Sequence, residues 1–165
     1  MAVVKSDLVT TEDTVGSQVE DHIEGAIKGK TSTYAASGAI SDNDVILMCK
    51  VPVDANLTSV ILNSDDLGTT GALNCGLYPA NGTTISADTD AVDEDCIATA
   101  VDVNTAAVSN SELRFEVQDI NTINSKAWEL AGLSARPDYD EFYVALTASA
   151  ATTAAGDISL KVEFI

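Results

Sequence analysis

The sequence has few of the side chains that carry out chemistry. It contains a single histidine, His22, three cysteines and one tryptophan. His22 has no nucleophile elbow near it, which argues against a Ser-His-Asp hydrolase. The total of eight aromatic residues offers few sugar-binding platforms for a glycosidase, whose paired carboxylates flank a substrate cleft. These shortages predict a protein that is not an enzyme and that needs no cofactor.

Basic residues are also scarce. The chain has 26 acidic and eight basic side chains, a net charge of −18 and a pI near 4.1. Between Lys50 and Arg114 there are ten acidic residues and no base. Such a surface repels phosphate backbones and anionic lipid headgroups. We therefore expect neither nucleic acid nor a membrane to be a partner.

Long apolar runs are missing as well. No run approaches the roughly 18 residues of a membrane-spanning helix. The N-terminus, MAVVKSDLVT, lacks the apolar stretch of a secretory signal, so we expect the protein to stay in the compartment where it is made. The 165 residues suit one domain with one core.

The cysteines do not suggest a disulfide framework or a metal site. Cys49, Cys75 and Cys96 are odd in number, and no pair has C-x₂-C spacing. Each lies inside an apolar segment, which predicts buried thiols that pack as small hydrophobes. A bridge between Cys75 and Cys96 on neighbouring strands remains an alternative, because the sequence does not give the distance between them.

The sequence does contain many short apolar segments bounded by Asp, Asn, Gly, Thr and Ser. Segments of this length, rich in Val, Ile and Thr, are typical of strands, and several at this spacing indicate a sandwich or barrel. From residue 31 onward we predict about eight strands. The main segments are DVILMCKVPV, LTSVILNS, LNCGLYP, CIATAVDV, ELRFEV, EFYVALTAS and DISLKVEFI.

Two local patterns refine this prediction. Leu113, Phe115 and Val117 alternate with polar residues, as in a half-buried strand. The segments 141–149 and 157–165 are expected to form a hairpin with a longer loop. Residues 123–133 change to helical spacing, with Asn124 or Ser125 as the cap and Gly132 as the stop. The predicted fold is an all-β, jelly-roll-like antiparallel β-sandwich with one short helix and an N-terminal arm.

The predicted arm comprises residues 1–32, and the predicted sandwich domain comprises residues 33–165. Val15, Val19, Ile23 and Ile27 recur every four residues in the arm, which gives a faint helical stripe interrupted by glycines. Terminal segments of this kind gain order against a partner. We therefore expect these four residues to contact a neighbouring protein or subunit; the alternative is an arm packed on its own sandwich.

One acidic loop is a possible metal site. Asp88, Asp90, Asp93 and Asp95, with Glu94 among them, crowd a short stretch, and Ca²⁺ takes six to eight oxygen ligands. The spacing lacks the glycine and the final glutamate of an EF-hand loop. The segment is therefore predicted to be a solvated acidic loop, with calcium as the alternative.

Three stretches, in this order, resemble a group of small virion proteins of tailed phages. The resemblance covers roughly residues 40–165 and depends on a pattern of strands and turns. The stretches are LTSVILNSDDLGTTGALNCGLYPANG, DAVDEDCIATAVDVNTA and WELAGLSARPDYDEFYVALTASAATTAAGDISLKVEFI.

The resemblance implies a structural role without catalytic residues. Proteins of this group are commonly found beside the major capsid protein and are described as structural or head-decoration proteins. The resemblance implies a decoration, or cement, protein that is made in the host cytoplasm, binds the major capsid protein on the outer capsid surface and stabilises the shell. Because oligomers follow closed symmetry, we expect it to be a homotrimer. The alternative is a phage fibre or tail-associated module that recognises a host-surface carbohydrate or protein through loops such as 80–95 and 134–141.

Overall fold

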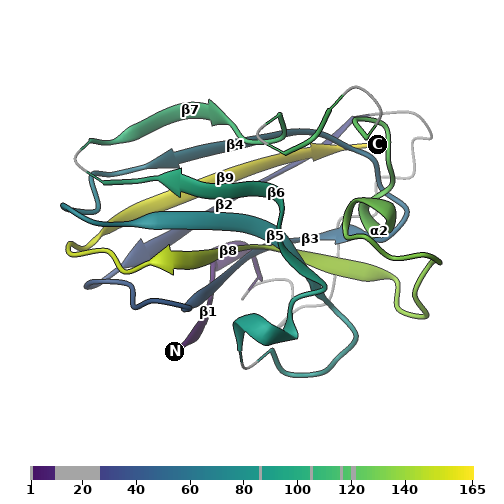
Figure 1. Ribbon diagram of the computed structural model, residues 1–165, viewed down its shortest axis with the longest axis horizontal. Helices are drawn as coiled ribbons and strands as arrows, with labels where there is room; N and C mark the ends of the chain where they lie inside the picture. The colour runs from purple at the N-terminus through teal and green to yellow at the C-terminus, as the bar shows by residue number, and fades with distance from the viewer. Residues whose placement is uncertain (1, 10–26, 86, 105, 116, 120–121) are drawn as a thin grey trace.

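A computed structural model describes residues 2–9, 27–85, 87–104, 106–115, 117–119 and 122–165. Within these residues, strands make up nearly all of the regular secondary structure (Figure 1). The elements are β1 (Val3–Lys5), β2 (Lys28–Ala36), β3 (Val45–Pro52), β4 (Leu57–Ser64), β5 (Ala72–Pro79), the 3₁₀ helix η1 (Asp88–Asp90), β6 (Asp93–Asp102), β7 (Val108–Glu112), α2 (Ala127–Leu130), β8 (Glu141–Ala150) and β9 (Gly156–Phe164).

The eight strands from β2 to β9 pair in nested order: the first pairs with the last, the second with the one before the last, and so on. β2 pairs with β9, β3 with β8, β4 with β7 and β5 with β6, and all four pairs are antiparallel. The pairs alternate between two sheets, with strand orders β1-β3-β8-β5-β6 and β2-β9-β4-β7. One long hairpin folded over itself in this way is a jelly roll. The predicted fold class is therefore confirmed.

The main core lies between the two sheets. In β9, Ile158, Leu160, Val162 and Phe164 are buried and alternate with more accessible residues, as the strand period of two requires. In β3, by contrast, consecutive residues from Val45 to Cys49 are all buried. A continuous buried run means that both faces of this strand are covered.

The second covered face belongs to the five-stranded sheet. Ile46 and Met48 of β3 join the main core, whereas Val45 and Leu47 point to the opposite face. There they pack with Tyr78, Ala145, Val9 and Ile85 in a smaller apolar cluster. The Tyr78 hydroxyl shares a 2.7 Å hydrogen bond with the Thr147 hydroxyl beneath this cover.

The first residues of the predicted arm supply part of that cover. β1 pairs in parallel with β3, and the Val45 N–H donates to the Ala2 carbonyl at 2.8 Å. Ser6 is fully buried; its N–H donates to the Leu47 carbonyl and its hydroxyl to the Met48 carbonyl. Val9, also fully buried, closes the outer cluster. Residues 2–9 therefore pack on their own sandwich.

The first strand of the sandwich also begins earlier than the sequence pattern suggested. β2 starts at Lys28 and pairs along its whole length with β9, from Lys28 opposite Phe164 to Ala36 opposite Gly156. The first three residues of this edge strand are two lysines and a glycine. They form no apolar pattern, so the sequence did not predict where the strand begins. Residues 28–32, assigned to the arm, are part of a sheet.

Two other predictions about strands are wrong. β8 and β9 do not form a hairpin: β8 pairs with β3 and β5, whereas β9 pairs with β2 and β4 in the other sheet. The segment 113–117 is not a strand either, because β7 ends at Glu112 and the chain then turns. Leu113 is buried, but Phe115 and Val117 are 60% and 51% exposed.

All three cysteines are buried thiols, and the alternative Cys75–Cys96 bridge does not form. Burial raises the pKa of the Cys75 and Cys96 thiols, since it disfavours the thiolate. Because the thiolate is the reactive species, we expect no thiol to react with an aromatic disulfide reagent at pH 8 in the folded protein. All three should react in denaturant. Rapid reaction of the folded protein would contradict this packing.

Candidate functional site

A polar cleft lies between the start of β6 and the segment that leads into α2. Its volume is about 230 Å³. One wall comes from β6 and the other from residues 117–130, which are distant from it in the sequence. The lining residues are Asp93, Asp95, Cys96, Thr99, Val117, Gln118, Thr122, Ser125, Glu129 and Leu130.

A large bulge in β6 places its carboxylates in this cleft. Cys75 of β5 pairs with Ala98, and Leu77 pairs with Asp93, so β6 uses five residues where β5 uses two. The extra residues fold over Gly76, where a β-carbon would lie 2.2 Å from the Asp93 carbonyl oxygen. Only glycine permits so close an approach of two backbones. Bulges of this kind re-aim side chains beside binding sites.

The two aspartates at the bulge lie against each other. The Asp95 N–H donates to Asp93 Oδ1 at 3.2 Å, and the Thr99 hydroxyl donates to Asp95 Oδ2 at 3.3 Å. Burial, followed by interaction with the Asp95 side chain, raises the pKa of Asp93. Both effects disfavour a second negative charge. A positive charge beside these two carboxylates would reduce the repulsion between them.

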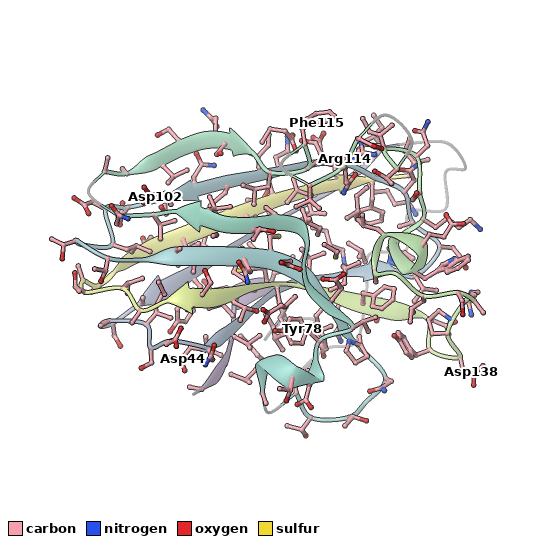
Figure 2. The ribbon with its side chains drawn as sticks, in the orientation of Figure 1. Asp44, Tyr78, Asp102, Arg114, Phe115 and Asp138 are labelled. Atoms are coloured by element: carbon pink, nitrogen blue, oxygen red, sulfur yellow. The ribbon has the colours of Figure 1, made fainter. Side chains whose placement is uncertain are left out.

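The opposite wall depends on a buried arginine. Arg114 is only 7% exposed; its Nε donates to Gln118 Oε1 and its Nη1 to the Thr58 carbonyl, both at 3.1 Å. Burial lowers the pKa of Arg114. In Figure 2, Phe115 lies at the outer edge of the molecule beyond β7, with Arg114 nearer the sheets. The hydrogen bond from Arg114 therefore holds the Gln118 side chain in place.

Gln118 is itself 7% exposed and has an unused donor. Its Oε1 accepts the hydrogen bond from Arg114 Nε, which leaves the Nε2 of the same amide. This nitrogen is buried and has no hydrogen-bond partner. An unsatisfied buried donor costs about 1–3 kcal/mol. The wall therefore lacks a hydrogen-bond acceptor.

α2 carries the third carboxylate of the cleft. The helix is held to the sandwich by Ala127 and Trp128, whose N–H groups donate to the carbonyls of Ala55 and Val53. Glu129 Oε2 accepts a 2.8 Å bond from the Lys126 N–H. The expected helix is confirmed, as is its stop at Gly132 with φ of 72°. Its cap is Lys126, two residues after Asn124 and one after Ser125, so the predicted cap was wrong.

The residues proposed for calcium lie on two consecutive elements. Asp88 and Asp90 belong to η1, whereas Asp93 and Asp95 belong to β6. Asp90 Oδ2 accepts a hydrogen bond from the Ala87 N–H at 3.0 Å. Across the described ranges, no three acidic, histidine or cysteine side chains form a group that could hold a metal ion.

The predicted arm contacts fall mostly outside the described residues. Val15, Val19, Ile23 and His22 all lie there. Ile27 is described: it precedes β2 and is 61% exposed.

No helix within the described part of the chain is long and apolar enough to cross a membrane.

Sequence reasoning found one wall of the cleft and missed the other. It singled out Asp93 and Asp95 but not Thr99, Gln118 or Glu129. The isolated Arg114, the first base after Lys50, was the available signal for a special environment. The pairing of that arginine with a glutamine four residues later was not recognisable without the turn between them.

A search against protein-family models gives no match, and a search against curated proteins gives none either. Among solved structures, a chain in the capsid of Ralstonia phage GP4 is similar, with a TM-score of 0.65 and 19% sequence identity. The alignment covers 99% of this chain and 97% of that one. A chain of the cyanophage Pam1 capsid asymmetric unit aligns over 84% and 83% at 17% identity, with a TM-score of 0.49. The first similarity shows that the jelly roll is shared over nearly the whole chain.

Proposed function

We propose that this chain is a non-enzymatic phage capsid decoration, or cement, protein that binds the outer capsid surface and stabilises the shell. The main support is the similarity to a chain of the GP4 capsid over 99% of the sequence. Because folds are reused, the similarity alone does not give function.

The physical properties of the chain suit this role. A sandwich with both faces of one sheet covered is a rigid body that can bridge neighbouring capsid subunits. Its charge of −18 keeps many copies soluble and apart before they bind. A protein that binds the closed shell better than its loosened form stabilises the shell by mass action.

The proposal includes the major capsid protein as partner and a homotrimer as the bound form, because a shell offers symmetric sites and oligomers follow closed symmetry. The stripe of Val15, Val19, Ile23 and Ile27 would contact the shell or a sister subunit. Ile27 supports this in part, since a large apolar side chain that is 61% exposed beside a sheet end is available for a contact.

Shell stabilisation can be tested by adding the purified protein to shells assembled without it. We expect bound shells to release their DNA at a higher temperature than bare shells, in proportion to occupancy, because ligand binding adds to the stability of the bound state. Heat-denatured protein provides the control. Binding without any change in the release temperature would remove the stabilising role and leave only attachment.

A further inference from the structure

We propose that two copies of this chain pair along β2, antiparallel and about a twofold axis, so that their four-stranded sheets become one continuous sheet. The inference goes beyond the proposed function and does not depend on it, because the pairing is a property of the chain itself. It is carried by the open hydrogen-bonding edge of β2, the only long and regular edge strand in the described part of the chain. A twofold contact is compatible with the proposed trimer, since on a shell it would join copies that belong to neighbouring trimers.

The other three sheet edges that the described residues form are short or irregular. β1 has only three residues, and β6 contains the bulge that folds over Gly76. β7 has five residues, a register shift against β4, and Asn110 with φ of 50°. β2, by contrast, matches β9 residue for residue over nine positions, without a bulge or a proline. A long, regular edge of this kind is a template for another strand.

The register shows which backbone groups of β2 lie on its open side. Ile165 exchanges both of its backbone hydrogen bonds with Asn56, on the β4 side of β9. Hydrogen bonding alternates along an antiparallel strand, so Phe164 and every second residue before it bond to β2. Their partners are Lys28 and every second residue after it. The residues in between direct their N–H and C=O groups away from β9; these are Gly29, Thr31, Thr33 and Ala35.

The open side of β2 is accessible. Gly29, Thr31 and Ala35 are exposed, and Thr33 is half-buried. Within the described ranges, no backbone hydrogen bond reaches the N–H or C=O groups of these four residues. The Thr33 hydroxyl shares a 2.8 Å hydrogen bond with the Ser159 hydroxyl of β9, which holds the edge strand on its sheet. An added strand would therefore find a preformed row of donors and acceptors.

A second β2 matches this edge when the two strands are centred on Ser32. Gly29 then lies opposite Ala35 of the second copy, and Thr31 lies opposite Thr33. All of these residues direct their backbone groups toward the other copy, and each opposed pair exchanges both hydrogen bonds, about eight in all. The side chains are small, and threonine pairs across two strands are favourable. The edge is therefore complementary to itself.

The lysines of β2 are compatible with this pairing. Lysine on an edge strand commonly protects it, because a second identical strand brings like charges together. In the register centred on Ser32, however, Lys28 lies opposite Ala36 of the second copy, and Lys30 lies opposite Tyr34. No lysine faces another lysine, and an aromatic ring is a favourable neighbour for a lysine.

The distribution of charge also favours a second copy. β2 has two lysines and no acidic residue, a combination that no other described strand has. The chain as a whole has a net charge of −18. Two copies that meet along β2 place basic edges between two acidic bodies, which lowers the repulsion between them.

Sedimentation equilibrium of the purified protein at about 0.15 M salt tests the pairing. Wild type should associate in steps of two, from monomer to dimer or from trimer to hexamer. Thr31→Pro removes an N–H from the open edge but none that bonds to β9, so it should weaken this association about tenfold or more. Thr31→Val keeps the N–H and should associate like the wild type. Circular dichroism checks that both variants are folded.

A cysteine cross-link tests the register independently of Thr31→Pro. Ser32→Cys would place two thiols across the twofold axis, where the Cα atoms of opposed residues are about 4.5 Å apart, a distance that suits a disulfide. Ser32 is only 3% exposed, whereas Ala35→Cys puts a thiol at an exposed position opposite Gly29. Random collisions would link the exposed thiol faster. We expect the reverse, with Ser32→Cys forming the linked dimer about tenfold faster, because pairing raises the effective concentration of its thiols.

The contrary results are equally specific. Equal association of wild type and folded Thr31→Pro would overturn the pairing, as would a wild type that shows no doubling. Faster linking of Ala35→Cys would overturn the register. If no protein pairs in solution and Thr31→Pro alone loses binding to shells, β2 receives an extended segment of a capsid protein and not a second copy. Failure of every protein to bind shells would contradict the proposed function and leave the pairing to be decided by sedimentation.

Discussion

Replacing Gly76 with alanine is expected to destabilise the folded protein by about 3 kcal/mol or more. The added β-carbon would lie 2.2 Å from both the Asp93 carbonyl oxygen and the Glu94 carbonyl carbon, a distance at which something must move. These are backbone atoms, so no side-chain rotation can relieve the overlap. Overpacking typically costs 1–3 kcal/mol, and a clash between two backbones falls at or above the upper end. Urea unfolding followed by circular dichroism measures the loss.

The effect should extend to the cleft, because moving β6 away from β5 displaces Asp93. Gly38→Ala is the matched control: a β-carbon there meets no atom within 4 Å, and the free energy of unfolding should stay within about 0.5 kcal/mol. If Gly76→Ala is as stable as the control, the close approach of β5 and β6 described here is wrong.

Replacing Val9 with aspartate is expected to cost about 3–5 kcal/mol. Val9 is fully buried over the outer face of the five-stranded sheet, against residues such as Tyr78 and Leu47. The substitution loses about 1.5–3 kcal/mol of apolar burial and places a carboxylate among the apolar side chains of this cluster. The midpoint of urea unfolding should fall accordingly.

Val117→Asp makes the same chemical change at a residue that is 51% exposed, and it should leave stability within about 0.5 kcal/mol of the wild type. Equal, small effects of both substitutions would mean that residues 2–9 do not cover the sheet in solution. In that case the N-terminal segment would be available as a free arm from its first residue.

Much of the sandwich could be predicted because the sequences of its core strands show the apolar patterns that are typical of buried strands. β9 alternates buried Ile158, Leu160 and Val162 with accessible residues, and β3 has an unbroken apolar run from Val45 to Cys49. The same reasoning failed at 113–117, where Leu113, Phe115 and Val117 also alternate but only Leu113 is buried. Alternation describes a strand only where a partner strand continues, and β7 stops pairing at Glu112.

The sequence also could not predict which strands pair with each other. β8 and β9 are adjacent in the sequence, but each lies between two other strands of its own sheet. At the N-terminus, β1 is only three residues long, and the first three residues of β2, Lys28 to Lys30, have no apolar side chain, so neither β1 nor the start of β2 was predicted. Deleting residues 1–30, which the sequence alone suggests as a test of the arm, would remove β1, Val9 and the first three residues of β2.

The cleft was only half predictable for a related reason. The aspartates of β6 stand together in the sequence, but their second wall comes from Gln118 and Glu129, which a turn and a short helix bring into place. The bulge that directs Asp93 into the cleft depends on Gly76, which looks like any strand glycine in the sequence. From the carboxylates alone, the sequence predicted a solvated acidic loop, with calcium as the alternative.

The copy number of this protein in purified phage particles tests the central proposal most directly. Quantitative mass spectrometry, normalised to the major capsid protein, should give a ratio near one to one or a simple fraction of it, because a cement protein occupies symmetry-related sites over the whole shell. A few copies per particle would contradict a lattice-wide cement and favour a fibre or tail-associated module. Absence from the particle would contradict a virion role altogether.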